Sequence, residues 1–352
     1  MRAIVKKNQR KGFDYIDMNK PKPKSNEVLI EVKVATICGT DMHYFNWDQM
    51  ASGFAEKYKV NFPFIVGHEC AGTIIEVGSQ VKNREVGQRV AIETHIPCGV
   101  CYACQTEKPH NCSNMKVYGT SCNGCFAEYT TVDERATFVL PEEITFEEGA
   151  LLEPAGVAMR AVEECKIVPG ECVVVCGCGP IGLMIVQILK ASGAACIIAV
   201  DKDKYRLCMA EQFGAITVNI EEQNVIEKTI ELTGVRGGAD VLIEASGSVD
   251  AYSYIFDLVR SEGRIITVGH PGTTVEIDVM KSVNIKGLSI KGIFGRRIWG
   301  TWWNLISLIK HKKINLLEII THQYYFEDYE KAFAQVHNGA GKVILVKGDT
   351  NG

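Results

Sequence analysis

The stretch Cys172-Val-Val-Val-Cys-Gly-Cys-Gly-Pro-Ile-Gly182 decides the fold of the central part of the chain. Its first five residues are apolar, as expected for a parallel strand that is buried on both faces. A glycine-rich turn follows, and the residues from Ile181 to Ser192 read as a helix. A strand, a glycine-rich turn and a helix in this order are typical of the first unit of a doubly wound α/β sheet.

Alternating strands and helices continue beyond this unit. Lys204 to Phe213 predicts another helix. Short apolar runs predict three further strands, at Cys196 to Val200, Asp240 to Glu244 and Arg264 to Val268. This alternation is the pattern of a parallel sheet with helices on its faces. Residues 156–294 are therefore expected to form a Rossmann-type α/β domain.

The glycine-rich turn has the spacing Gly-x-Gly-x-x-Gly, formed by Gly177, Gly179 and Gly182. The first glycine permits the tight turn, the second allows close approach of a pyrophosphate, and the third lets helix and strand pack closely. The helix that begins around Ile181 directs free N–H groups at the phosphates. The turn is therefore predicted to bind a dinucleotide.

Asp201 ends the next predicted strand, nineteen residues after Gly182. An acidic residue at this position accepts hydrogen bonds from the adenosine ribose hydroxyls and repels a 2′-phosphate. This favours NAD over NADP as the cofactor. Lys202 and Arg206 are nearby cations that could accommodate such a phosphate, and we count Arg206 among the expected cofactor contacts.

The chain before about residue 150 is different, because short strands are separated there by Gly, Pro and Asn. Alternating apolar residues between Val28 and Val34 predict one strand. Similar runs occur at 71–77, 89–92 and 126–132. We expect this part to be mostly β, with long functional loops between the strands.

The alternation of strands and helices stops after about residue 295. Two helices, at Trp299 to His311 and Phe326 to Asn338, and a last strand, Lys342 to Val346, are expected there. A length of 352 residues suits two domains that each bury a core of their own.

Four cysteines lie close together in the sequence, and we call them the cysteine lobe: Cys98, Cys101, Cys104 and Cys112. Their spacing allows one loop to surround a single tetrahedral ion with four sulfur atoms. A zinc ion bound by four thiolates has no open position for a substrate, so such a site is structural. An iron–sulfur cluster is the alternative, but the ferredoxin spacing is tighter and carries a proline where this chain has Ser113.

The remaining cysteines are scattered, and several lie inside apolar runs, as is usual for reduced thiols in a cytosolic protein. The first ten residues have no apolar core of a signal peptide, and glycines interrupt the longest apolar stretch. A net charge of -4 gives no electrostatic basis for binding nucleic acid. We therefore expect a cytoplasmic protein that binds neither nucleic acid nor membrane.

A second candidate metal site is formed by Cys38 and the pair His68 and Glu69. Cysteine, histidine and carboxylate are the ligand types of a catalytic zinc, which keeps one position open for water or substrate. Zinc makes an alcohol easier to deprotonate, and the alcohol carbon can then give hydride to a nicotinamide. A structural histidine and a core thiol are the alternative interpretation, and only the combination with the dinucleotide turn favours zinc.

These motifs, in this order, resemble the zinc-dependent medium-chain alcohol dehydrogenase family. The resemblance covers Cys38-Gly-Thr-Asp-Met-His43, Gly67-His68-Glu69, the cysteine lobe, Glu153-Pro154 and the glycine-rich turn. It implies a GroES-like catalytic domain at 1–155 that contains the structural zinc, a Rossmann domain at 156–294 and a return to the catalytic domain at 295–352. It also implies a homotetramer that acts on a small-molecule alcohol.

The resemblance also assigns individual residues. It implies one catalytic Zn²⁺, held by Cys38, His68, Glu69 and the carboxylate of Glu153, besides the structural Zn²⁺ of the lobe. Which of the two carboxylates binds the metal at rest stays open. Thr40 and His43 fall on the family's proton relay, in which a hydroxyl and an imidazole carry the alcohol proton outward.

Within the family the chain looks most like the L-threonine 3-dehydrogenases. The matching segments are His43-Tyr-Phe-Asn-Trp-Asp48, Glu93-Thr-His95-Ile96, Gly295-Arg296, Thr301-Trp302 and Ile319-Ile-Thr-His322. The resemblance implies that His95 lines the substrate pocket, and Arg296 is a candidate contact for the cofactor phosphate or the substrate carboxylate. Two positions depart from the pattern, with Val157 in place of Asn and Gly300 in place of Glu.

Three functions therefore remain open. The first is oxidation of L-threonine to 2-amino-3-oxobutanoate. The second is oxidation of a polyol, an amino-polyol or a vicinal diol, which Val157 and Gly300 allow. The third is a non-catalytic nucleotide-binding protein, because a fold alone does not determine function.

Overall fold

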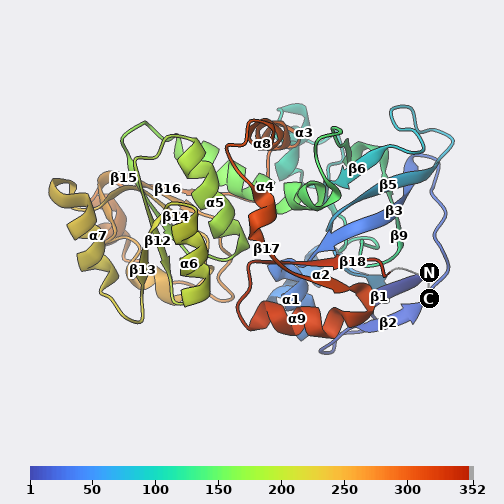
Figure 1. The fold of residues 1–352 in the computed structure, drawn as a ribbon, viewed down its shortest axis with the longest axis horizontal. Helices are drawn as coiled ribbons and strands as arrows, with labels where there is room; N and C mark the ends of the chain where they lie inside the picture. The colour runs from blue at the N-terminus through green and yellow to red at the C-terminus, as the bar shows by residue number, and fades with distance from the viewer. Residues whose placement is uncertain (349–352) are drawn as a thin grey trace. The chain divides into compact units, whose positions relative to one another are not determined.

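The computed structural model describes residues 1–348 of the chain (Figure 1). The chain divides into two compact units. The first comprises Met1–Pro154, Ile320–Asn338 and the chain from Lys342, and the second comprises Ala155–Ile319 and Gly339–Gly341. The first unit is therefore built from separate parts of the sequence, and most of the second unit is inserted between them.

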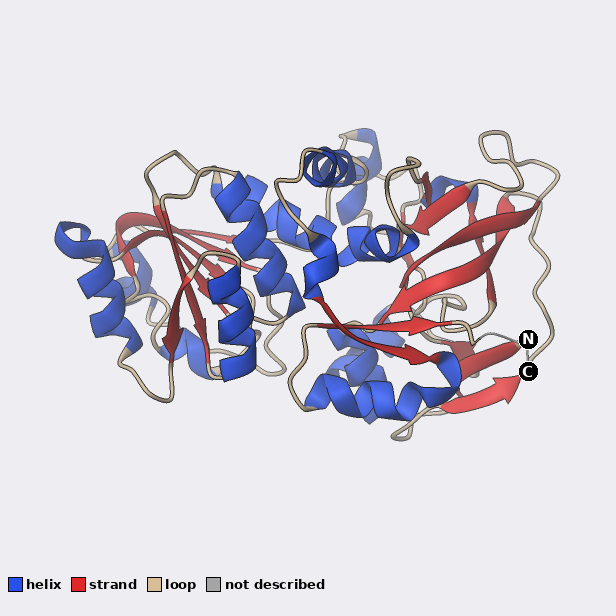
Figure 2. Cartoon of the chain, viewed as in Figure 1, coloured by secondary structure: helices blue, strands red, loops and turns tan. Residues whose placement is uncertain are grey.

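The second unit contains one parallel sheet of six strands, drawn in red in Figure 2. The strands are β11 (Cys172–Cys176), β12 (Cys196–Asp201), β13 (Ile216–Asn219), β14 (Ala239–Glu244), β15 (Val259–Thr267) and β16 (Ser289–Gly292). Their spatial order is β13-β12-β11-β14-β15-β16, so the order reverses between β11 and β14. A reversal of this kind creates the crevice in which doubly wound sheets bind ligands.

The helices of the second unit are α5 (Pro180–Ala191), α6 (Lys204–Gln212), α7 (Val225–Thr233) and α8 (Gly300–Lys310). The first three contact strands of the sheet, and α5 packs on β11 and β12 (Figure 1). Every residue of β11 and β14 is buried. This explains why the two strands read as almost continuous apolar runs in the sequence.

The first unit is mostly β, as expected. Its strands are β1 (Arg2–Lys6), β2 (Asp14–Asp17), β3 (Glu27–Thr36), β4 (Phe64–Ile65), β5 (Glu69–Val77), β6 (Arg89–Ile92), β7 (His95–Ile96), β8 (Lys116–Val117), β9 (Tyr129–Asp133), β10 (Thr137–Val139), β17 (Ile320–Tyr325) and β18 (Lys342–Val346). The largest sheet runs in the order β10-β6-β5-β3-β18-β17, and β9 also pairs with β3. In this sheet β3 lies between β5 and β18, which brings residues near 36, 69 and 342 together.

Three helices lie inside the first unit where the sequence predicted only strands and long loops. These helices are α1 (Gly39–Asn46), α2 (Gln49–Lys57) and α3 (Tyr102–Gln105), followed later by α4 (Phe146–Cys165) and α9 (Tyr329–His337). Helix α4 contains Pro154 and runs across the boundary between the two units.

The return to the first unit occurs at Ile320, later than the residue 295 expected from the sequence. Asn315 exchanges hydrogen bonds of 2.8 and 3.0 Å with Gln187 of α5, so the segment that contains α8 stays with the second unit. The last four residues of the expected 295–352 segment lie outside the described residues. Within residues 1–348 no helix is both long enough and apolar enough to cross a membrane.

Candidate active site and metal centres

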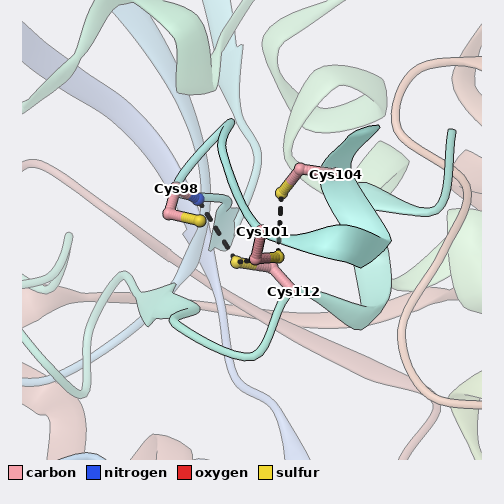
Figure 3. Close-up of side chains that lie close together, drawn as sticks. All are labelled: Cys98, Cys101, Cys104 and Cys112. Atoms are coloured by element: carbon pink, nitrogen blue, oxygen red, sulfur yellow. Dashed lines mark hydrogen bonds between the residues drawn. The ribbon is translucent and has the colours of Figure 1, made fainter. Parts of the chain in front are cut away.

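The cysteine lobe brings its four sulfur atoms together, as Figure 3 shows. Cys101 Sγ lies 3.5 Å from Cys104 Sγ and 3.7 Å from Cys112 Sγ. A tetrahedral zinc ion with bonds of about 2.3 Å to sulfur requires sulfur atoms about 3.8 Å apart. The lobe is therefore suited to hold one zinc ion.

Backbone N–H groups also prepare these thiols for a metal. The Cys98 N–H lies 3.3 Å from Cys112 Sγ. N–H groups of Cys104 and Ser113 lower the pKa of Cys101 to about 5, whereas burial raises the pKa of Cys112 to about 12. Such donors stabilise thiolates, which are the form that binds zinc. All four ligand positions are filled by protein, so this site suits a structural role.

The second group of ligands, which we call the catalytic cluster, consists of Cys38, His68 and Glu69. One potential ligand atom from each residue lies within 4.8 Å of those of the other two. Cys38 caps the N-terminus of α1, and the other two residues lie at the start of β5. The sequence hypothesis brought these same three residues together. They leave room for a fourth ligand, as a catalytic zinc requires.

Asp41 orients two members of the catalytic cluster. Its Oδ2 accepts a hydrogen bond of 2.9 Å from the Cys38 N–H, and its Oδ1 lies 3.6 Å from Nδ1 of His68. Burial opposes a charge on His68, but Asp41 and Cys38 raise the pKa of its imidazole well above the usual value. A carboxylate behind a ligand histidine fixes the ring orientation and increases its basicity toward a metal.

Glu69 is fully buried, and its two carboxylate oxygens have different surroundings. Oε2 lies 2.6 Å from the ammonium group of Lys342 and accepts a hydrogen bond from the Thr36 hydroxyl. Burial opposes a charge on Lys342, but Glu69 and Cys38 raise the pKa of its ammonium group. Oε1 has no hydrogen-bond partner although it is buried. A metal ion among the three ligands would satisfy this oxygen.

Glu153 lies on α4 and is connected to the catalytic cluster through Thr94. The Thr94 hydroxyl lies 2.5 Å from Glu153 Oε1 and 3.2 Å from the carbonyl oxygen of His68. Glu153 also contributes to the charge around Glu69 and raises the pKa of that residue, after burial, which is the larger cause. Glu153, whose role was assigned only by the family resemblance, is therefore close enough to influence the charge of the catalytic cluster.

Thr40 and His43 lie one turn apart on α1, behind Cys38. The Thr40 hydroxyl is 3.8 Å from Cys38 Sγ. His43 Nδ1 lies 2.5 Å from Oδ2 of Asp48, which caps α2. Burial opposes the charge on Asp48, but bonds from His43 and the Ala51 N–H lower its pKa. The acid orients the imidazole and leaves its other nitrogen available for proton transfer.

The glycine-rich turn fits a dinucleotide. A Cβ atom at Gly177, where φ is +96°, would lie 2.6 Å from Ser246, and one at Gly182 would lie 1.9 Å from the Gly177 carbonyl oxygen. A Cβ atom at Gly179 would meet nothing within 4 Å. The open space at Gly179 is where a pyrophosphate would approach. Ile181 follows in the first turn of α5, whose N-terminal N–H groups suit phosphate.

Asp201 ends β12 beside this turn, and its Oδ2 accepts a hydrogen bond of 2.6 Å from the Cys178 N–H. The carboxylate is therefore fixed against the dinucleotide turn. Arg206 points elsewhere, because its Nε donates to the carbonyl oxygen of Ala340 and lies 4.0 Å from Asp203. This arrangement weakens the argument that Arg206 accommodates a 2′-phosphate.

The two residues proposed for the substrate lie in different units. His95 is buried in β7, where its N–H donates 2.9 Å to Glu93. Arg296 is buried in the second unit, and a Cβ atom at Gly156 would lie 2.9 Å from its Cδ. Gly300 is exposed at the start of α8, and a Cβ atom there would meet nothing within 4 Å.

Sequence reasoning missed the residues that support the catalytic cluster. They are Thr36, Asp41, Asp48, Thr94 and Lys342. Only two of them had a local signal, since Asp41 forms a capping box three residues after Cys38 and Asp48 caps a helix. The others meet the cluster through pairing of distant strands or through contact with α4.

Comparison with known proteins agrees with this geometry. Residues 24–142 match the model of the alcohol dehydrogenase GroES-like domain, and residues 180–311 match that of the zinc-binding dehydrogenase domain. The chain belongs to the zinc-dependent alcohol dehydrogenase family. The predicted fold class, the predicted enzyme class and zinc as a cofactor are thereby confirmed.

Proteins similar to this chain are named for different alcohol substrates. The L-threonine 3-dehydrogenase of Bacillus subtilis (strain 168) is 39% identical over 348 residues, which cover 98% of each protein. The crystal structure of 2R,3R-butanediol dehydrogenase from Bacillus subtilis has a TM-score of 0.87 and 30% identity, and covers 99% of each chain. A dehydrogenase from Escherichia coli CFT073, crystallised with NADH, has a TM-score of 0.87 and 27% identity, covering 98% of this chain and 99% of that one.

Proposed function

We propose that this alcohol dehydrogenase oxidises the secondary hydroxyl group of L-threonine, with NAD as hydride acceptor, to give 2-amino-3-oxobutanoate. The observation that carries the proposal is the catalytic cluster, in which three ligand types converge and the buried Oε1 of Glu69 has no other partner. Full-length similarity to L-threonine 3-dehydrogenases supports this choice of substrate.

Each member of the catalytic cluster has a distinct part. Cys38, His68 and Glu69 would hold the zinc ion, and Glu153 is the further carboxylate near them. Bound there, the ion would act as a Lewis acid and make the alcohol proton easier to lose. The Lys342 ammonium keeps Glu69 Oε2 occupied, so Oε1 is the oxygen directed to the metal. We therefore assign Glu69 as the resting ligand.

The alcohol proton would leave through Thr40 and His43. Thr40 offers a hydroxyl beside Cys38, and His43 lies one turn farther along α1, where it is partly exposed. Asp48 holds His43 Nδ1, so Nε2 is the nitrogen that takes the proton. This arrangement supports general-base catalysis at the outer end of the path.

Threonine and neutral polyols demand different pockets. A bound amino acid needs partners for its carboxylate and its ammonium group, since buried charges must be paired. We propose His95 and Arg296 for the carboxylate and the acids Glu93 and Glu153 for the ammonium group, with Arg296 also a candidate for a cofactor phosphate. A polyol, amino-polyol or vicinal diol remains the second candidate, and the similarity to 2R,3R-butanediol dehydrogenase favours it.

NAD rather than NADP is the proposed cofactor because Asp201 is fixed beside the dinucleotide turn. Asp201→Ala should weaken NAD binding about ten- to a hundredfold and relax discrimination against NADP, since a charged hydrogen bond contributes about 1.5–3 kcal/mol. Titration of the variant with both cofactors measures the effect. An unchanged preference for NAD would contradict the assignment.

We also propose a homotetramer in the cytoplasm. The cysteines among the described residues are not joined in disulfides, which supports a reducing compartment. The tetramer rests on family resemblance alone. Sedimentation equilibrium would test it directly.

The substrate is tested by measuring NADH formation with the zinc-loaded protein. L-threonine, L-allo-threonine, 2,3-butanediol and sorbitol form the necessary panel. L-threonine should have the highest kcat/KM, because a site built for charged groups rejects analogues that leave those groups unpaired. Turnover of a neutral diol without turnover of threonine would contradict the threonine proposal and support the second candidate, a polyol or vicinal diol. In that case Gly300→Glu tests whether this position influences the choice of substrate. The open space at Gly300 accepts the larger side chain.

A further inference from the structure

The fully buried carboxylate of Glu244 lies outside the metal sites, at the end of β14. Glu244 Oε1 accepts hydrogen bonds from the N–H groups of Ser246 (2.8 Å) and Gly247 (3.0 Å) and from the Ser246 hydroxyl. Three donors on one oxygen are the surroundings of an ionised carboxylate rather than of a neutral acid. The group is therefore a buried negative charge.

The other oxygen of this carboxylate is unsatisfied. Glu244 Oε2 is buried and has no hydrogen-bond partner. A Cβ atom at Gly269 would lie 2.5 Å from it, so Oε2 faces the segment that follows β15. Within residues 1–348 no lysine, arginine or histidine forms an ion pair with Glu244. A buried charge without a counter-ion is costly, which suggests that a positive charge outside the protein compensates it.

The position of Glu244 in the sheet indicates which charge this is. The strand order reverses between β11 and β14, and a dinucleotide lies across the ends of the strands at such a point. Gly177 of the dinucleotide turn packs on Ser246, which Glu244 holds in place. Asp201 at the end of β12 is the expected partner of the adenosine ribose, so the adenosine half of the dinucleotide lies at that side of the crevice. The nicotinamide half then lies at the ends of β14 and β15.

We propose that Glu244 selects the oxidised cofactor, because its uncompensated charge lies in the nicotinamide half of the crevice. The two cofactor forms share their phosphates and riboses, but only the oxidised ring carries a positive charge. An anion that water does not screen attracts this ring and leaves the reduced ring unaffected. The inference rests on the NAD-dependent function proposed above, and it adds a residue that sets the balance between the two redox states.

The test is direct binding of both cofactors, without any alcohol present. Glu244→Gln keeps the shape and an acceptor oxygen but removes the charge. Calorimetric titration should show NAD binding about tenfold weaker, with NADH binding changed less than about twofold. A tenfold change in this ratio corresponds to about 30 mV in the potential of the bound couple. The control is Glu211→Gln, which removes an exposed charge on α6 of the same unit and should leave the ratio unchanged.

Glu244→Asp separates the charge from the packing. It keeps the carboxylate, so the ratio of the two affinities should stay near that of the parent protein even if both affinities fall. If Glu244→Gln weakened the binding of NAD and of NADH equally, Glu244 would only hold the turn at Ser246 and Gly247 in place. That result would overturn the inference. Failure of the parent protein to bind either cofactor would instead overturn the NAD-dependent function, and this inference with it.

Discussion

The cysteine lobe and the catalytic cluster are both candidate zinc sites, but they are built in opposite ways. The lobe takes all its ligands from one short stretch, and three of its four cysteines are partly exposed. In the catalytic cluster, Cys38 comes from a helix start, Glu69 is the first residue of β5 and His68 directly precedes it, and both of these residues are buried. The lobe uses backbone N–H groups to support its thiols, whereas the cluster uses Asp41 and Lys342.

This difference in construction distinguishes a structural zinc site, which stabilises the fold, from a catalytic zinc site, which takes part in the reaction. Four sulfur ligands saturate the ion, so the lobe can contribute folding energy but offers no position to a substrate. Three ligands leave a position open, and buried charged neighbours adjust the affinity for the metal and its acidity. Equivalent substitutions in the two regions should therefore have unlike consequences.

The largest expected effect is loss of turnover in Cys38→Ser. Removal of this ligand should lower alcohol-dependent NADH formation by at least about 10³-fold, because several kcal/mol of Lewis-acid stabilisation are lost. The midpoint of thermal unfolding should stay close to that of the parent protein. Activity is measured with NADH absorbance and the fold with circular dichroism. Substantial remaining activity would mean that the metal does its chemistry elsewhere.

Cys104→Ser should affect stability instead. Loss of one thiolate opens the lobe, and the free energy of unfolding should fall by about 4 kcal/mol or more. Chemical denaturation measures the change. The matched control is Cys122→Ser, an exposed cysteine outside both sites, which should change stability little. If the Cys104→Ser protein were as stable and as active as the parent protein, the structural role proposed for zinc in the cysteine lobe would be contradicted.

His43→Gln tests the proton path from the catalytic cluster. The rate of hydride transfer should fall about 10²- to 10⁴-fold, as is usual for loss of a general base. The loss should be greatest at low pH, where outward proton release is hardest, and zinc content should not change. Pre-steady-state measurements across pH are required. A change in the KM for NAD with an unaltered pH profile would instead make His43 a cofactor contact.

Lys342→Gln should produce the smallest of these effects. Without the ammonium group, Glu69 Oε2 loses its ion pair and is no longer held away from the metal. The affinity of the catalytic cluster for zinc should fall about 10- to 100-fold, as for other partners of metal ligands, while zinc in the lobe is retained. Competition with a chelator distinguishes the two ions. Lys347→Gln, which changes a lysine paired with Glu31 just beyond β18, is the control.

The contrast also explains how far the sequence could predict the sites. The cysteine lobe and the glycine-rich turn are local patterns, since their spacing fixes their geometry within one loop. The structure therefore places their members as the sequence led us to expect. Glu153 had no such signal, because Thr94 connects it to the catalytic cluster only after α4 has packed against the sheet.

The unpredicted residues depend on contacts between distant strands. Lys342 lies on β18, which pairs with β3, and β3 pairs with β5 at Glu69. No periodicity in the sequence indicates that these strands are neighbours. The compact units divide at Ile320 rather than at residue 295 for a similar reason, since the side chain of Gln187 holds Asn315 in the second unit. Local patterns are readable from sequence, and pairings of distant segments are not.

Zinc content is the most direct test of the claim that this chain has two metal sites with separate roles. Elemental analysis of the purified parent protein, Cys38→Ser and Cys104→Ser should be combined with NADH formation in the same preparations. We predict two zinc ions per parent chain and one in each variant, with activity lost together with the ion of the catalytic cluster. One zinc ion per parent chain, or full activity in Cys38→Ser after loss of that ion, would contradict the account.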